Sequence, residues 1–309
     1  MKFWKMNGAG NDFVVLNNLE EHLPVELLPQ IAKTLCERHL SIGADGLMVV
    51  DAPTQGGDYK MRFYNSDGSM GEMCGNGARC ICRYGYETGL AGETQTVETT
   101  AGIVTGKRIS SRLYRIRLND PTTVKLDASV EVDGVRYPCA YVELGNPGIP
   151  HAVIPYAGLR QADENELREL GRAIRWHKDF PKGANVNFYE LTGEDSLYER
   201  TFERGVEDFT YACGTGTGSV VTVLTLQGKV SGHGVKVDMA GGQLMVDAER
   251  NGSRIDSLYR TGPHRQPVSH RSHQHRLQGR GHRRGAGTPR AVKSLYVRPQ
   301  GHTECVCKP

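Results

Sequence analysis

The sequence contains no hydrophobic run long enough to cross a membrane. A membrane-spanning helix needs about 18–20 consecutive apolar residues, and none of the 309 positions starts such a stretch. Residues 1–6 have neither an apolar core nor a small-residue cleavage site, so they do not resemble a secretion signal. We therefore expect a cytoplasmic protein with no membrane partner.

The sequence also has little net charge of either sign, only +3 over the whole chain. Residues 264–309 contain ten Lys or Arg and one acid, a net charge of +9, which leaves residues 1–263 at −6. This basic segment has a single aromatic residue, Tyr296, so its contacts with nucleic acid would be non-specific and salt-sensitive. We expect no specific nucleic-acid partner.

A Cys-x-x-Cys pair, the usual spacing of a structural zinc site, is missing from the eight cysteines. Within one helix Cys80 and Cys82 point about 200° apart, so they do not converge on one ion. No lysine occurs in a motif typical of pyridoxal phosphate enzymes. We therefore expect neither a metal nor a cofactor, and reduced thiols in a cytosolic chain.

Hydrophobic periodicity divides residues 1–263 into alternating helices and strands. Helices are predicted at residues 25–40, 75–88, 164–175 and 214–227. Strands are predicted at residues 47–50, 61–64, 96–99, 103–106, 113–118, 130–135, 139–144, 151–154, 185–191, 197–202, 235–239 and 243–248. Residues 264–309 are rich in His, Arg, Gly, Ser and Pro without any periodicity, which predicts a disordered basic tail.

One motif occurs twice, once in each half of the sequence. Cys74 and Cys213 each begin a Cys-Gly-polar-Gly segment that follows a strand and a loop and opens a predicted helix. The repeat indicates a duplicated architecture, an α/β fold of the mixed α+β class with two similar domains facing each other across a cleft. We place the domains at residues 1–118 and 119–263. Two unrelated glycine turns are the alternative.

A cysteine at the start of a helix has a chemical rationale. Free backbone N–H groups and the helix dipole lower the pKa of a thiol from about 8.5 and bind an anion beside it. The glycines leave room for a ligand carboxylate to approach the backbone. Two such sites, facing each other, could remove a proton from one face of a carbon and deliver one to the other, which would invert a stereocentre without a cofactor. Buried structural cysteines are the alternative.

Four motifs in register resemble the diaminopimelate epimerase family across residues 1–263. They are MNGAGNDF at residues 6–13, FYNSDGS at 63–69, MCGNGAR at 73–79, and ERG at 203–205 followed by ACGTG at 212–216. The resemblance implies two pseudo-symmetric domains, each a curved, mostly antiparallel sheet around a central helix. It also implies a homodimer that interconverts LL- and meso-diaminopimelate without a cofactor.

The resemblance also implies the roles of the site residues. Cys74 and Cys213 would be the catalytic acid and base, supported by His151 and Glu203. Arg204 would bind the distal carboxylate as a bidentate fork. The substrate-binding set would be Asn11, Asn65, Gly75, Asn76, Asn146, Asn185, Arg204, Gly214 and Thr215.

Two other functions stay open at this point. A proline or hydroxyproline racemase uses a similar pair of cysteines, although that family typically has His where this chain has Asn76, and its substrate has no distal carboxylate for Arg204. An inactive epimerase-like protein is the second alternative, because the sequence departs from the family at two places. Asn146-Pro147 is separated from His151 by three residues, whereas the family has the three residues adjacent.

The second departure is the C-terminus, where the resemblance stops at Pro263. The family has a final strand there that returns to the first domain, and its loss would expose an unpaired sheet edge. We hypothesise that residues 264–309 come from a frame-shifted reading frame. We expect the +1 or −1 frame of the gene to encode a strand-like ending, and a gene in which neither frame does so would show the tail to be genuine.

Overall fold

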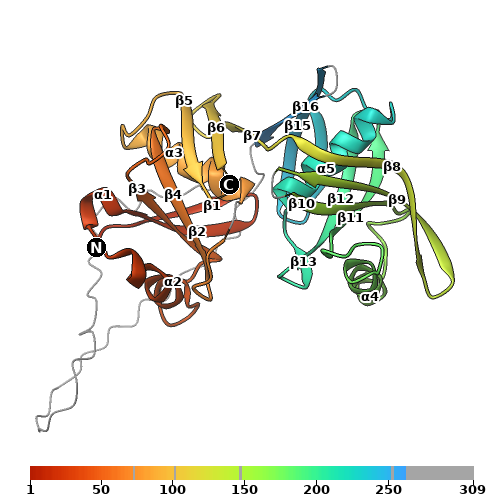
Figure 1. Ribbon diagram of the computed structural model, residues 1–309, viewed down its shortest axis with the longest axis horizontal. Coiled ribbons are helices and arrows are strands. Elements are labelled where there is room, and N and C mark those ends of the chain that lie inside the picture. The colour runs from red at the N-terminus through yellow and green to blue at the C-terminus, as the bar shows by residue number, and fades with distance from the viewer. Residues whose placement is uncertain (72–73, 101, 146–147, 252–253, 262–309) are drawn as a thin grey trace, which may run out of the picture.

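The computed structural model describes residues 1–71, 74–100, 102–145, 148–251 and 254–261. The fold is mixed α+β, with two halves that lie side by side (Figure 1), as the sequence predicted. The first half contains β1 (Trp4–Gly8), β2 (Asn11–Asn17), α1 (Asn18–Glu21), the 3-10 helix η1 (Val25–Leu27), α2 (Leu28–Cys36), β3 (Gly46–Asp51), β4 (Tyr59–Asn65), α3 (Gly75–Glu87), β5 (Thr94–Thr99), β6 (Gly102–Arg108) and β7 (Tyr114–Arg117).

The second half follows the same plan. It contains β8 (Pro121–Val132), β9 (Val135–Leu144), β10 (Ile149–Pro155), α4 (Glu164–Arg175), β11 (Asn185–Gly193), β12 (Ser196–Glu203), β13 (Asp208–Thr210), α5 (Gly214–Leu226), β14 (Val235–Met239), β15 (Gly242–Asn251) and β16 (Arg254–Thr261). Strand β16 pairs with β7, so one continuous sheet runs through both halves.

The strand pairings of the two halves are the same. From β1 to β7 they run antiparallel, parallel, antiparallel, parallel, antiparallel and antiparallel. From β9 to β16 they run in the identical order. Strand β8 is the extra member, because it pairs with β9 while its counterpart beside β1 does not occur among the described strands.

Helices α3 and α5 are the centres of the two halves. Ala78, Ile81 and Tyr84 of α3 pack among buried residues of β1 to β7. Val220 and Leu224 of α5 pack among buried residues of β9 to β15. A helix that is apolar around most of its circumference is stable only where it is enclosed, which explains why the valine-rich α5 lies inside its curled sheet. Helices α2 and α4 pack in separate clusters.

The N-terminal ends of α3 and α5 touch each other. A Cβ atom built on Gly214 would lie 3.4 Å from the Cα atom of Gly75, and one built on Gly75 would lie 3.6 Å from the Cα atom of Gly214. This backbone contact holds the two central helices end to end where the halves meet.

Several boundaries differ from the sequence predictions. The helix expected at residues 25–40 ends at Cys36, because the chain then turns through His39 and Gly43, which have positive φ angles of 71° and 72°. Strands β1, β2, β13 and β16 were not predicted, since β1 and β2 meet at the tight turn Ala9-Gly10 and carry few alternating apolar residues. Helix α4 was predicted at its observed bounds, and the predicted tail lies outside the described residues.

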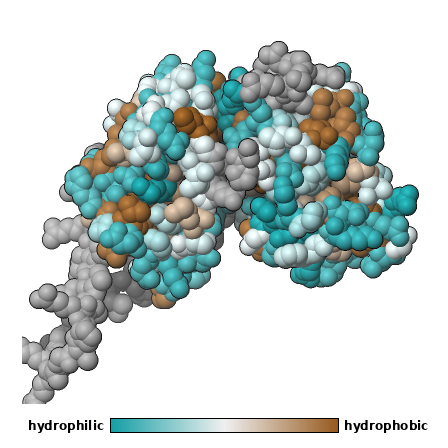
Figure 2. Space-filling view, in the orientation of Figure 1, coloured by the Kyte–Doolittle hydropathy of each residue, from teal (hydrophilic) through white to brown (hydrophobic). Residues whose placement is uncertain are grey.

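No helix in the described part of the chain is both long and apolar enough to span a membrane. Figure 2 shows hydrophilic residues over most of the face that it draws, with hydrophobic groups in separate small areas.

The last glycine of each cysteine motif, Gly77 or Gly216, provides a matched test of the packing beneath the helices. Gly216→Ala should lower the free energy of unfolding by about 1–3 kcal/mol, because its Cβ would overlap Asn187 Oδ1, on a side chain fixed by hydrogen bonds. Gly77→Ala is the control, since its Cβ would meet the flexible end of Met48. Urea unfolding measures both, and equal losses would show that the fixed amide does not matter.

Candidate active site

The two predicted thiols occupy the same position in the two halves. Cys74 is the N-cap residue of α3 and Cys213 is the N-cap residue of α5, both with extended backbone angles. Cys74 is half-buried, and Cys213 is 7% exposed. Because the residues that follow them, Gly75 and Gly214, are in contact, the structure brings both thiols to the junction of the halves.

Burial dominates the electrostatics of both thiols. It raises the pKa of Cys74 above its usual value, while N–H groups of Gly77 and Asn76 act in the opposite direction. It also raises the pKa of Cys213 well above the usual value, against the Thr215 hydroxyl and the Gly216 N–H. The helix-end N–H groups lower both thiol pKa values, as expected, but desolvation of the thiolate outweighs them, so the net shift of both pKa values is upward.

Glu203 is the carboxylate that acts on both cysteines. It is the last residue of β12, and its burial raises its own pKa. Its negative charge raises the pKa of Cys74 and that of Cys213. A charge shifts the pKa values of two groups only when it lies close to both. Glu203 therefore lies near both Cys74 and Cys213, as its predicted supporting role requires.

Asn76 connects the two halves through its side chain. Its amide nitrogen donates to Asn11 Oδ1 at 2.7 Å and to the backbone carbonyl of Ala212 at 3.4 Å, and its amide oxygen accepts from Arg79. Asn76 is 1% exposed. Asn11 in turn donates to Asp45 Oδ2 at 3.1 Å. The structure therefore brings Asn11 and Asn76 together beside the residue that precedes Cys213.

His151 and Asn185 are neighbours on two parallel strands, and Arg204 contacts the second of them. His151 pairs with Asn185 in the register of β10 and β11. Asn185 donates to the carbonyl of Pro150 at 3.2 Å and accepts from the Arg204 backbone N–H at 2.8 Å. Burial and the positive charge of Arg204 lower the pKa of His151 to about 3, so the imidazole is neutral at physiological pH.

Two predicted site residues have fewer described contacts. Asn65 is exposed, donates to Ser69 Oγ at 2.9 Å, and pairs with Gly46 at the end of β4. Gly46 also pairs with Phe13 of β2, so Asn65 and Asn11 lie at the same end of these neighbouring strands. Asn146 lies outside the described residues, and its predicted role stays a prediction.

Three polar residues near the site were missed by the sequence analysis. Asn187 is fully buried, and Thr201 and Glu199 are 3% and 1% exposed. They hydrogen-bond in a row that ends at His151. The available signal was their spacing, because Glu199, Thr201 and Glu203 occupy alternate positions and hence one face of a strand.

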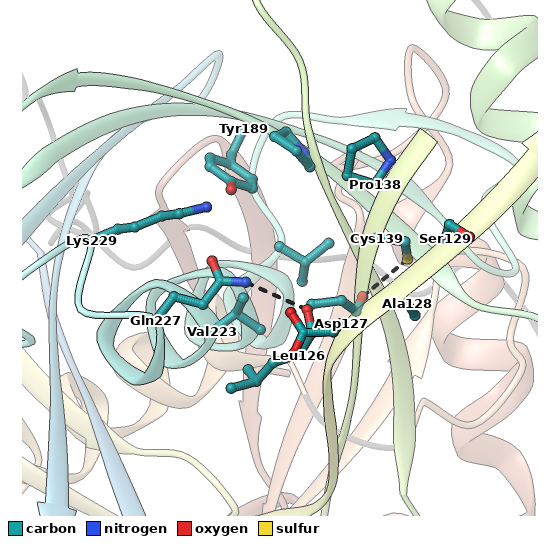
Figure 3. A pocket seen from close by; sticks show the side chains of 13 residues that line it. Leu126, Asp127, Ala128, Ser129, Pro138, Cys139, Tyr189, Val223, Gln227 and Lys229 are labelled. Carbon is teal, nitrogen blue, oxygen red and sulfur yellow. Dashed lines mark hydrogen bonds between the residues drawn. The ribbon is translucent and has the colours of Figure 1, made fainter. Parts of the chain in front are cut away.

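Other cysteines and a cavity in the second half lie apart from the thiol pair. No group of three or more His, Cys, Asp or Glu suited to a metal occurs in the parts of the chain that the structure describes. Cys80 faces Gly8, whereas Cys82 faces Gly106. A cavity of about 390 Å³ lies in the second half between β8, β9 and the end of α5 (Figure 3), and neither Cys74 nor Cys213 lines it.

The fold of this protein also occurs in solved structures of other proteins. A probable proline racemase from Agrobacterium radiobacter and a hydroxyproline epimerase from Agrobacterium vitis have the same fold, with TM-scores of 0.61 and 0.60. Both are 15% identical in sequence, and each alignment covers 84% of this chain and 88% of the other.

Curated relatives are much closer in sequence. Diaminopimelate epimerase of Aquifex aeolicus is 38% identical over 255 residues, which is 80% of this chain and 89% of that protein. The Caldanaerobacter subterraneus enzyme of the same name is 37% identical over 279 residues, 85% of this chain and 96% of that protein. The family model described as diaminopimelate epimerase matches residues 3–109 and 144–266. The chain therefore belongs to the diaminopimelate epimerase family.

Proposed function

We propose that this protein is an isomerase that interconverts LL- and meso-diaminopimelate by exchanging a proton at one α-carbon, a step in lysine biosynthesis. Its curated relatives carry the name of that enzyme. The observation that supports the reaction most directly is the contact between Gly75 and Gly214, because it places one N-cap cysteine from each half beside one junction.

The chemistry assigned to the two cysteines is a proton transfer on each face of the substrate. One thiolate removes the α-proton, the electron pair stays on the α-carbon, and the opposite thiol donates its proton to the other face. The first sulfur ends as a thiol and the second as a thiolate, so the reverse reaction uses them in exchanged roles. No electron leaves or enters, and the reaction needs no cofactor.

The remaining site residues are assigned to binding. Backbone N–H groups of Gly75-Asn76 and Gly214-Thr215, at the positive ends of two helices, would hold the carboxylate next to the reacting carbon and stabilise the negative charge that develops there. Asn11, Asn65, Asn146 and Asn185 would bind the polar groups of the substrate, and Arg204 its distal carboxylate.

Other parts of the proposal concern the whole protein. We propose that residues 1–118 and 119–263 form the two domains, that two chains associate as a homodimer, and that the protein is cytoplasmic. A proline racemase remains the second candidate function because solved proline and hydroxyproline enzymes share the fold. Asn76 favours the diaminopimelate substrate, since it occupies the position at which the proline enzymes typically have histidine.

The first prediction tests the two-base reaction itself. In D₂O, LL-diaminopimelate should acquire deuterium at one α-carbon as the meso form appears, as mass spectrometry and NMR detect. Cys74→Ala and Cys213→Ala should each reduce the exchange by at least about 100-fold, because each removes one acid–base group.

Cys139→Ala is the matched control for these variants, because Cys139 is also a buried cysteine but lies at the separate cavity. Exchange into proline and none into diaminopimelate would favour the racemase candidate. Full exchange in both cysteine variants would rule out the thiol pair.

The second prediction concerns Glu203. Glu203→Gln removes the negative charge that raises both thiol pKa values, so more thiolate should form at a given pH. Alkylation of Cys74 and Cys213 by iodoacetamide at about pH 9 should accelerate roughly 2–10-fold. Peptide mass spectrometry separates these two from the other cysteines.

Glu166→Gln is the control for the charge change, since Glu166 is an exposed carboxylate in the first turn of α4. It should leave both alkylation rates unchanged. Slower or equal alkylation in Glu203→Gln would contradict the position of Glu203 beside the pair.

A further inference from the structure

The shared topology of the halves pairs each position of one half with a position of the other. Parallel strands β2 and β3 match β10 and β11, and antiparallel strands β3 and β4 match β11 and β12. The registers Phe13↔Gly46 and His151↔Asn185 make Phe13 the counterpart of His151. By the same registers, Met48, Phe63 and Met61 are the counterparts of Asn187, Thr201 and Glu199.

These four counterpart positions differ completely in chemistry. The first half fills them with apolar side chains, three of which are at most 1% exposed. The second half fills them with a histidine, an amide, a hydroxyl and a carboxyl group, all at most 3% exposed. Burying polar groups is costly unless they are paired. Since apolar residues serve the same fold in the first half, the polar set has a purpose other than forming the fold.

The hydrogen bonds of Asn187 have one consistent direction. Its amide nitrogen lies 3.1 Å from the carbonyl of Ala152, 3.3 Å from that of Asn185 and 3.2 Å from His151 Nδ1. Two carbonyl acceptors fix the orientation of the amide, because the amide oxygen could not face them. The amide nitrogen has two N–H donors, which its three neighbours share, and it cannot accept a proton from the ring. His151 Nδ1 is therefore the unprotonated nitrogen, and the proton of the neutral ring is on Nε2.

The next member of the row is Thr201, whose single hydroxyl proton has two neighbours. Thr201 Oγ1 lies 3.1 Å from Asn187 Oδ1 and 3.2 Å from Glu199 Oε1. The amide oxygen can only accept, so it takes the hydroxyl proton. Glu199 Oε1 can then bond to Thr201 only by donating a proton. A neutral Glu199 that donates to Thr201 therefore satisfies both contacts, whereas an ionised Glu199 would compete with Asn187 Oδ1 for the one hydroxyl proton.

The burial of Glu199 agrees with this direction. Burial raises the pKa of Glu199 to about 8, against the hydroxyls of Thr217 and Thr201, which lower it, so the carboxyl group keeps its proton at neutral pH. Its second oxygen, Oε2, has no hydrogen-bond partner among the described residues. An unpartnered buried oxygen is far less costly on a neutral acid than on a carboxylate.

The row leads to the candidate active site. His151 is fully buried, and its Nε2 also has no partner in the described part of the chain. His151 pairs with Asn185, and Val186 pairs with Phe202, so His151, Asn185 and Glu203 lie at the same end of three neighbouring strands. An unpartnered buried N–H at this end is a hydrogen-bond donor available to a group at the thiol pair.

We propose that Glu199, Thr201 and Asn187 are positioning residues that hold His151 as the neutral Nε2–H tautomer, with Glu199 as the terminal proton donor of the chain. The proposal rests on the proposed function, because it assigns the free Nε2–H of His151 as a donor in the epimerase site. The three residues act through His151 and not on the substrate.

The experiment measures the tautomer first, in the protein without substrate. Long-range ¹H–¹⁵N NMR of the His151 ring should show an unprotonated Nδ1 and a protonated Nε2 between about pH 5 and 7, where Glu199 keeps its proton. Asn187→Asp replaces the donor with an acceptor and should move the proton to Nδ1. Infrared spectroscopy should show the C=O band of a buried protonated carboxyl group that Glu199→Gln removes.

Two substitutions of Glu199 separate positioning from packing. Glu199→Gln keeps a donor of the same shape, so kcat for diaminopimelate should stay within about threefold of the wild type. Glu199→Met places there the residue that the first half has at position 61, so it should fold but lower kcat about tenfold, the value of one lost hydrogen bond, with little change in KM. Asn187→Asp should lower kcat at least about 100-fold.

The possible outcomes discriminate between this proposal and the proposed function. A protonated Nδ1 in the wild type, or the absence of the carboxyl band, would overturn the chain, and these two measurements need no variant that might unfold. Equal kcat values for Glu199→Gln and Glu199→Met would also overturn it. If the tautomer behaves as expected but deuterium exchange is unaffected in Asn187→Asp, the chain stands and the catalytic role proposed for His151 fails.

Discussion

The contact between the ends of α3 and α5 is the constraint on which the rest of the structure depends. Gly75 and Gly214 approach so closely that a Cβ atom on Gly214 would lie 3.4 Å from the Cα atom of Gly75. A Cβ atom at either position would make only ordinary van der Waals contact with the other helix end, so the two helix N-termini lie next to each other without overlap. The meeting aligns two positive dipole ends, which repel each other unless negative charge lies nearby. The carboxylate of Glu203, and an anionic substrate, supply that charge.

The two halves share one topology but surround their cysteines with different side chains. Both halves use the same strand pairings and have a glycine at the fourth motif position, but Gly77 lies on Met48 whereas Gly216 lies on Asn187. The first half is thus a hydrophobic support for Cys74, and the second half places a buried polar row behind Cys213. The two thiols therefore have unlike surroundings, apolar behind Cys74 and polar behind Cys213.

The sequence predicted those features that depend on local patterns. Helices α3, α4 and α5 were predicted almost to the residue because apolar spacing and the Cys-Gly motifs define them. The pairing of the motifs across the halves followed from their repetition. The raised thiol pKa values could not be predicted, because burial depends on the packed halves and not on the helix end alone. Asn187, Thr201 and Glu199 were missed for the same reason, since they are adjacent only after β11 and β12 pair.

Strand β1, at the edge of the first half, packs next to the candidate site although the two are far apart in the sequence. Strand β1 pairs with β2 alone among the described strands, whereas its counterpart β9 is flanked by both β8 and β10. A Cβ atom on Gly8 of β1 would lie 2.8 Å from the carbonyl oxygen of Asn76 and 3.0 Å from Cys80 Sγ. The edge strand therefore packs directly on the first turn of α3. An edge strand has fewer hydrogen bonds to hold it than a central strand. A displacement of β1 would therefore displace Asn76. Asn76 hydrogen-bonds to Asn11 and to Ala212, so the displacement would also change the junction of the two thiols.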